Sequence, residues 1–162
     1  MAVKKNATKS TVEPVRFFRR SVIRQHGELA APLPMNPLYL LKALFTSAPR
    51  LAPREFADRV RAGDALLIDV REPREWEAGV AAQSVLLSFT DLMGPRRRWR
   101  FFLADMKDRD LYFYCTAGWR SAIAARLLAA EGYRTANTGT LSDWAAAGWP
   151  VLTLAERKSL PR

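Results

Sequence analysis

The sequence predicts an α/β domain with a mainly parallel central sheet flanked by helices, preceded by a basic, irregular N-terminal extension. Three observations predict this class. Short apolar segments alternate with helix-like segments from residue 53 onward. An apolar run at 65–70, interrupted only by Asp69, is typical of a strand buried on both faces, and an apolar segment at 111–115 leads directly into a loop and a helix. Ligand-binding groups gather at the carboxyl ends of parallel strands, so functional residues are expected there.

Proline and glycine mark the first elements. Pro53 suits the first turn of a helix and Gly63 suits its C-terminal stop, while Phe56 and Val60 lie on one face between them. The apolar run at 65–70 then forms the first predicted strand.

The later elements alternate in the same way. They are a short acidic helix at 73–79, a strand at 85–89, a helix at 95–106, a strand at 111–115, a helix at 121–131, a strand at 133–137 and a short helix at 141–147. Gly132 ends the helix at 121–131, and Gly148 follows the last helix.

The only cysteine of the chain stands at the end of a predicted strand and begins the loop Cys115-Thr116-Ala117-Gly118-Trp119-Arg120-Ser121. A tight loop that opens a helix turns unpaired N–H groups toward its first residue, and the helix dipole adds positive charge. Arg120 adds a permanent cation, and these groups together lower the pKa of a thiol. Cys115 is therefore a candidate nucleophile.

The alternative for Cys115 is an inert cysteine that packs like a small apolar side chain. Gly118 permits a tight backbone and Ser121 can cap the helix, which favours the nucleophile. Trp119 is a bulky residue for such a loop, and it serves either as a lid over the sulfur or as a docking surface.

Cysteine and histidine counts exclude several other classes of site. One cysteine forms no internal disulfide, which favours a reducing interior, either the cytoplasm or an organelle matrix such as that of mitochondria. The single histidine, His26, is expected at the surface, so Ser-His-Asp and Cys-His arrangements and a zinc cage are not expected. No apolar run approaches the roughly 18 residues of a membrane span, so a soluble protein without one is expected.

Positive charge is concentrated in the first 50 residues. The net charge is +10, and residues 1–50, with nine basic and two acidic residues, hold +7 of it. Residues 15–24 have the composition of a short amphipathic helix. Three interpretations stay open for this region: a solvated tail, an organelle-targeting presequence, or an arm that docks on RNA, lipid or a protein complex. Residues 38–45 are apolar enough to pack on the core or on a partner.

Two charged groups lie outside the loop. The arginine-rich run at 95–100, which includes Trp99, is either a nucleic-acid contact or a solvated helix face, and the second is favoured because successive residues point around a helix. Asp69, Arg71 and Glu75 are expected to form a structural ion-pair network rather than a catalytic acid and base. Trp144 is expected in the core.

Three ordered segments carry a family resemblance. They are Leu67-Ile68-Asp69-Val70-Arg71-Glu72-Pro73 with Glu75-Trp76, the loop from Cys115 to Ser121, and Trp144 with Gly148-Trp149-Pro150-Val151. Together they resemble the single-domain rhodaneses, sulfurtransferases that carry sulfur as a cysteine persulfide. The resemblance implies a rhodanese-like domain at 51–152, with residues 1–50 as an extension and 153–162 as a tail.

Two segments depart from the family pattern. After Gly79 the family usually continues His-Ile-Pro-Gly-Ala, where this chain has Val80-Ala81-Ala82-Gln83-Ser84, and the paired glycine before the last helix is Gly139-Thr140 here. Both segments support the core near the loop, so they bear on its packing.

The resemblance also implies a mechanism. Cys115 would attack the outer sulfur of a small anionic donor such as thiosulfate, release sulfite and become a persulfide, from which cyanide, an acceptor thiol or a protein takes the sulfur. Arg120 would fix the loop or attract the donor. Substrate would be held by Thr116, Ala117, Gly118, Trp119 and Ser121. No cofactor is implied.

Loop length separates this chemistry from that of related phosphatases. Those enzymes of the same fold use a Cys-x5-Arg loop that holds phosphate, whereas Cys115 to Arg120 spans Cys-x4-Arg, which suits a single sulfur.

Two hypotheses of different class remain. One is a sulfurtransferase that uses Cys115, and the other is a non-catalytic rhodanese-like subunit anchored by its basic arm in a large complex, for example an organellar one, or in a ribonucleoprotein.

Overall fold

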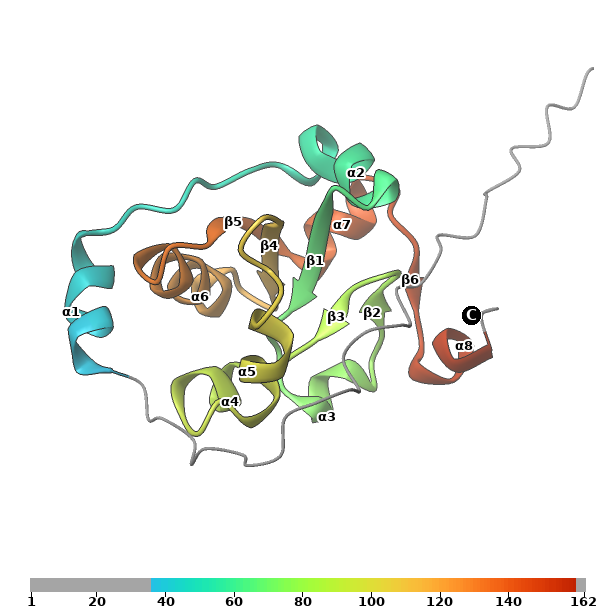
Figure 1. Ribbon diagram of the computed structural model, residues 1–162. Helices are drawn as coiled ribbons and strands as arrows, with labels where there is room; N and C mark the ends of the chain where they lie inside the picture. The colour runs from blue at the N-terminus through green and yellow to red at the C-terminus, as the bar shows by residue number, and fades with distance from the viewer. Residues whose placement is uncertain (1–35, 160–162) are drawn as a thin grey trace, which may run out of the picture.

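A four-stranded parallel sheet with the strand order β3-β1-β4-β5 forms the centre of the computed structural model, which describes residues 36–159 (Figure 1). The strands are β1 (Ala65–Asp69), β3 (Val85–Leu86), β4 (Asp110–Cys115) and β5 (Arg134–Thr140). A separate antiparallel pair joins β2 (Val80–Ala81) to β6 (Val151–Leu152). The predicted fold class, a mainly parallel sheet flanked by helices, is confirmed.

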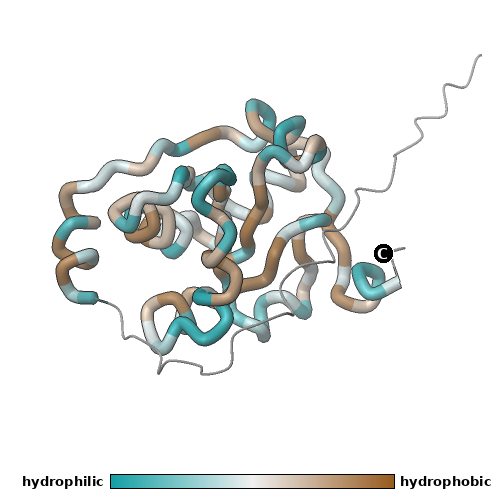
Figure 2. The backbone as a smooth tube through the Cα atoms, in the orientation of Figure 1, coloured by the Kyte–Doolittle hydropathy of each residue, from teal (hydrophilic) through white to brown (hydrophobic). Residues whose placement is uncertain are grey.

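Helices cover both faces of the sheet. The described helices are α1 (Pro37–Phe45), α2 (Pro53–Ala62), α3 (Pro73–Trp76), α4 (Phe89–Met93), α5 (Arg97–Leu103), α6 (Trp119–Ala130), α7 (Leu141–Ala146) and α8 (Leu154–Ser159). One buried cluster packs the sheet against α4, α5 and α6, and a second packs it against α2 and α7. In Figure 2 the tube is brown along much of the central strands, which marks hydrophobic residues between these layers.

Strand β4 shows why the sheet needs both layers. Its side chains alternate, because successive residues of a strand point to opposite faces. Phe113 and Cys115 belong to the cluster on the α6 side, whereas Tyr112 and Tyr114 belong to the cluster on the α2 side. Cys115 is therefore the last residue of β4 on the face that packs against α6, in a strand that is buried on both faces.

The helix predicted from Pro53 to Gly63 is confirmed. Pro53 occupies the first turn of α2, and Gly63 ends the helix with φ of 80°, a left-handed conformation in which glycine carries no steric penalty. The amide of Gly63 donates to the carbonyls of Arg59 and Val60, which satisfies the helix end.

The strand predicted at 85–89 is shorter in the structure. Ser88 caps α4 by accepting a hydrogen bond from the Asp91 amide, so Phe89 begins a helix and β3 ends at Leu86. Helix α6 begins at Trp119, two residues before the predicted start, and β5 continues to Thr140, beyond the predicted end at 137.

Part of the predicted extension is attached to the sheet. Arg50 forms a parallel bridge to Asn137 of β5, and two backbone hydrogen bonds of 2.9 Å, from Leu51 to Asn137 and from Asn137 to Pro49, fix this edge. Residues 15–24 and His26 lie outside the described residues. In the predicted tail the structure has helix α8.

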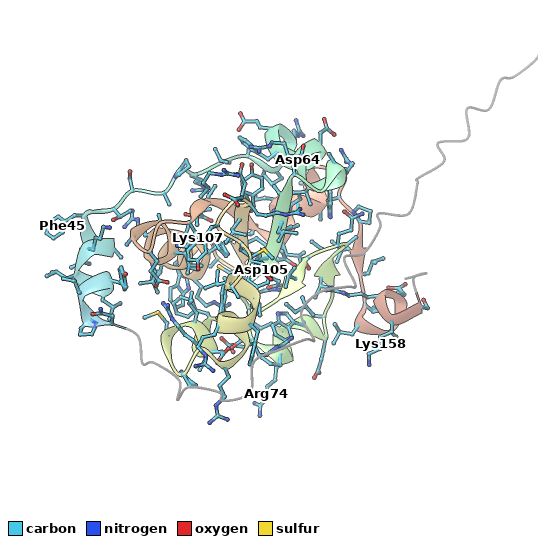
Figure 3. All side chains as sticks on the ribbon, in the orientation of Figure 1. Phe45, Asp64, Arg74, Asp105, Lys107 and Lys158 are labelled. Carbon is cyan, nitrogen blue, oxygen red and sulfur yellow. The ribbon has the colours of Figure 1, made fainter. Side chains whose placement is uncertain are left out.

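Helix α1 lies beside α6 and leaves most of its apolar side chains exposed. Ala43 packs partly against the core, whereas Leu38, Leu41, Leu44 and Phe45 are exposed. Figure 3 labels Phe45 at the outer edge of the molecule, at the end of α1. The segment thus uses one face on the core and presents the other to solvent.

The two segments that depart from the family pattern keep local structure. Gln83 stands where the family has glycine and adopts φ of 66°, a left-handed conformation that costs a non-glycine residue about 1–2 kcal/mol. Ser84 is buried, and its hydroxyl donates to the Tyr114 hydroxyl oxygen at 3.3 Å. Thr140 caps α7 by accepting from the Asp143 amide at 3.1 Å, so this substitution adds a helix cap.

Candidate active site

The sulfur of Cys115 lies at the N-terminal end of α6, as the sequence predicts. β4 ends at Cys115, and Gly118 caps α6 with φ of 81°. The Gly118 amide donates to the Cys115 Sγ at 3.0 Å, and the Ser121 hydroxyl lies 3.5 Å from the same atom. A residue other than glycine at position 118 would be strained in this conformation, so the loop depends on Gly118.

The pKa of the Cys115 thiol lies below its ordinary value. Burial is the strongest single influence and acts to raise the pKa. Hydrogen bonds from the Ser121 hydroxyl and from the amides of Ser121, Ala117 and Gly118 favour the thiolate, and together they outweigh the burial. The loop therefore stabilises the form of sulfur that reacts as a nucleophile.

Asn137, which the sequence analysis did not select, holds the loop from β5. Its side-chain oxygen lies 2.8 Å from the Ser121 hydroxyl oxygen, where it competes with the Cys115 sulfur for the one hydroxyl proton. The same oxygen accepts a hydrogen bond from the Gly139 amide at 3.0 Å, and the Asn137 amide group donates to the Gly118 carbonyl at 3.2 Å. Ser121 is not the helix cap that the sequence analysis proposed, because Gly118 occupies that position. The signal that could have identified Asn137 is a polar residue at the carboxyl end of the predicted strand at 133–137.

Arg120 is held by a bidentate ion pair with Glu75. Its two terminal nitrogens lie 2.6 and 2.7 Å from the Glu75 carboxylate oxygens, and Thr116 donates to the same carboxylate at 2.5 Å. The hydrogen bond from Arg120 is the main reason why the pKa of Glu75 falls to about 2. Of the two roles expected for Arg120, the geometry supports the one of fixing loop shape.

Asp69 and Arg71 form a buried ion pair below the loop. Arg71 Nη2 lies 2.6 Å from Asp69 Oδ2, and the Tyr114 hydroxyl donates to the same oxygen at 2.7 Å. Arg71 also donates to the carbonyls of Glu75 and Gly79. Every one of these contacts is internal, which supports the predicted structural role.

Trp119 lies exposed on the rim of the loop. Its ring contacts that of Phe89 edge to face, with centroids 5.7 Å apart, and 55% of the residue's surface is accessible to solvent. The guanidinium of Arg120 lies 5.8 Å from the centre of the Trp119 ring. Phe89 is a second residue of this region that the sequence analysis did not identify.

Cys115 itself has an exposed fraction of 0%. Thr116 and Ala117, which follow it, are exposed. A reagent in solvent therefore has no direct access to Sγ in this conformation of the loop.

We expect Ser121→Ala to raise the pKa of Cys115, because it removes a hydrogen bond that stabilises the thiolate. The rate of alkylation by iodoacetamide, measured against pH, should then rise at higher pH than in the wild-type protein, and should fall severalfold at neutral pH. Ser84→Ala, which changes another fully buried serine, serves as the matched control and should leave the profile unchanged. A profile for Ser121→Ala at or below the wild-type pH would contradict this assignment.

Helix α5 settles one alternative for the arginine-rich run. Trp99 is fully buried and its Nε1 donates to the Ser88 carbonyl at 2.9 Å, so its ring is not free to stack on a base. Arg96 pairs with Glu131 at 2.8 Å, whereas Arg97 and Arg98 are exposed. Trp144 is buried in the core, as expected.

Residues 36–159 contain neither a metal-binding cluster nor a membrane-spanning helix. No group of three or more acidic, histidine or cysteine side chains is arranged there to hold a metal ion. Among the same residues, every helix is too short or too polar to cross a membrane.

Comparison with known proteins agrees with this geometry. Residues 52–147 match the family model described as "Rhodanese-like domain". A protein named "Sulfurtransferase" from Allochromatium vinosum is 33% identical over 92 residues, which cover 55% of this chain and 79% of that protein.

Two solved structures with the same fold are matched over most of their own length. A rhodanese-related protein from Thermoplasma volcanium matches 64% of this chain and 97% of its own, with a TM-score of 0.52 and 23% identity. The rhodanese-like domain of an Anabaena protein matches 70% of this chain and 86% of its own, with a TM-score of 0.53 and 20% identity. At these identities the two structures support the fold alone.

Proposed function

The chain belongs to the rhodanese-like domain family, a family that includes sulfurtransferases, and from this premise we propose that it transfers a sulfane sulfur through a persulfide on Cys115. The observation that supports this most strongly is the environment of Sγ. The sulfur accepts a hydrogen bond from the Gly118 amide at 3.0 Å, at the N-terminal end of a twelve-residue helix. The pKa of the Cys115 thiol is lowered despite its burial.

The first step loads the sulfur. The Cys115 thiolate attacks the sulfane sulfur of the donor, a new S–S bond forms, the S–S bond of the donor breaks, and its electron pair leaves with the rest of the donor. With thiosulfate the leaving group is sulfite, and charge balances because one thiolate and one dianion become one persulfide anion and one dianion. No oxidant or reductant is needed.

The loop amides then hold the negative charge of the persulfide. The amides of Ala117, Gly118 and Ser121 already act on the sulfur of Cys115, and the outer sulfur would extend into the same group of donors. Because Cys115 is the only cysteine, no second thiol of the chain can take the sulfur. The acceptor is therefore another molecule, such as a thiol, a protein or cyanide.

The test is intact mass spectrometry of the folded wild-type protein after incubation with excess thiosulfate or, in parallel, methanethiosulfonate. We expect an increase by the mass of one sulfur atom, which cyanide or a reducing thiol removes. Absence of this adduct with both donors, in protein shown to be folded, would count against sulfur transfer by this chain.

Two observations favour a second candidate, the non-catalytic subunit. Cys115 has no exposed surface, and helix α1 presents Leu38, Leu41, Leu44 and Phe45 to solvent. A module of this kind would bind through such a surface and would need no reactive sulfur. This second candidate predicts a folded protein that forms no sulfur adduct. Intact mass spectrometry therefore separates the two functions.

A further inference from the structure

The rim of the loop offers an apolar surface to a donor. Trp119 and Phe89 pack edge to face, Phe89 is half-buried, and the Trp119 ring is exposed. The Phe89 amide donates to the Val70 carbonyl directly after β1, so both rings lie at the carboxyl edge of the sheet, where Cys115 also lies. The exposed ring supports a docking surface for Trp119 rather than a lid.

The charges around the loop oppose a strongly anionic donor. Arg120 is the only cation of the loop at 115–121. Both of its terminal nitrogens donate hydrogen bonds to the Glu75 carboxylate. The Cys115 sulfur and the Glu72 carboxylate also act on Arg120 and raise its pKa. Two carboxylates and one thiolate thus act on one guanidinium, and one of these carboxylates pairs with it directly.

This excess of negative charge matters more for a dianion than for a monoanion. Each pair of unit charges at a few ångströms contributes about 1 kcal/mol in water and more in a less polar environment. Arg71 does not offset the excess, because Asp69 neutralises it in a buried pair. Thiosulfate, with two negative charges on a small body, therefore gains less from this site than a monoanion does.

We propose that the donor is an organic persulfide or thiosulfonate with no more than one negative charge, whose apolar group lies on Trp119 beside Phe89. This inference rests on the proposed sulfur transfer and names the class of its donor. With a thiosulfonate, the Cys115 thiolate takes the sulfane sulfur, the donor S–S bond breaks, and its electron pair leaves on the sulfinate. One thiolate and one monoanion become one persulfide anion and one monoanion.

Three donors separate the contributions of charge and of apolar contact. Thiosulfate is a dianion, methanethiosulfonate is a small monoanion, and benzenethiosulfonate is a monoanion with an aromatic ring. The rate of persulfide formation on Cys115 is measured by intact mass for each donor. Each rate is divided by the rate at which the same donor loads a free thiol in solution, which removes differences in intrinsic reactivity.

For the wild-type protein we expect the normalised rate to be highest with benzenethiosulfonate and lowest with thiosulfate. The advantage of benzenethiosulfonate over methanethiosulfonate should be about tenfold, the effect of one aromatic contact. Trp119→Ala should reduce this advantage to about twofold, because the ratio of the two thiosulfonate rates then no longer includes a contact with the Trp119 ring. Trp119→Leu, which keeps an apolar side chain, should give an intermediate value.

Phe101→Ala is the matched control, because Phe101 on α5 has the same exposed fraction of 55%. It should change none of the three rates. Glu72→Gln tests the charge contribution: it should raise the rate with thiosulfate severalfold and the rate with methanethiosulfonate less. Circular dichroism and a cooperative thermal transition confirm that each variant is folded.

The outcomes are distinguishable. Thiosulfate loading as fast as the organic donors, or Trp119→Ala leaving the advantage of benzenethiosulfonate intact, would overturn this inference while sulfur transfer stands. Loading by none of the three donors into the folded wild-type protein would remove the proposed function, and this inference with it.

Discussion

Cys115→Ser is expected to reduce sulfur transfer to the uncatalysed rate, a loss on the order of 10⁴-fold or more in kcat. A serine hydroxyl at this position keeps the size of the side chain but is not ionised at neutral pH, so the loop amides have no anion to stabilise. It also cannot form a persulfide. The measurement is turnover of a sulfane-sulfur donor to cyanide or to an acceptor thiol, together with intact mass.

Ser121→Ala is the appropriate comparison for this variant. It removes one hydrogen bond to the sulfur and keeps the nucleophile, so a slower but measurable turnover is expected. Cys115→Ser should unfold at close to the wild-type temperature, which would show that the loss is chemical. Residual turnover in Cys115→Ser above that of Ser121→Ala would place the reaction on a different group.

The loop could be predicted from sequence because its determinants are contiguous. A strand, a cysteine, Gly118 and a helix follow one another, and local rules are sufficient to place the sulfur at a helix N-terminus. The helix from Pro53 to Gly63 was predictable for the same reason. Ser88 and Asp91 also form a local capping signal, so the start of α4 could have been identified from the sequence.

The contacts that hold the loop could not be predicted in this way, because they join residues distant in sequence. Asn137 reaches Gly118 and Ser121 from another strand, and Phe89 meets Trp119 from another helix. These pairings depend on which strands are neighbours in the sheet. The burial of Trp99 has the same origin, since it follows from how α5 lies on the sheet.

Asp69→Asn is expected to lower the free energy of unfolding by about 3–5 kcal/mol, because it leaves the Arg71 guanidinium charged, buried and unpaired. Asp69 has an exposed fraction of 0% and Arg71 of 5%, so water cannot replace the lost partner. Since folded domains are stable by only about 5–15 kcal/mol in total, this is a large fraction. Urea denaturation followed by circular dichroism measures the change.

Asp58→Asn is a matched control, because the Arg61–Asp58 pair has the same nitrogen–oxygen distance of 2.6 Å but is exposed to solvent. Its cost should stay below about 1 kcal/mol, since solvent screens such pairs. If Asp69→Asn prevents folding altogether, Tyr114→Phe removes one hydrogen bond to the same carboxylate and the acceptor of the Ala81 amide, and should cost about 2 kcal/mol. Costs for Asp69→Asn and Tyr114→Phe no larger than that of Asp58→Asn would show that the buried pair does not support the strand that carries Cys115. Because Asp69 and Tyr114 are register partners on β1 and β4, and Cys115 follows Tyr114, loss of the pair should also displace the sulfur from the loop amides.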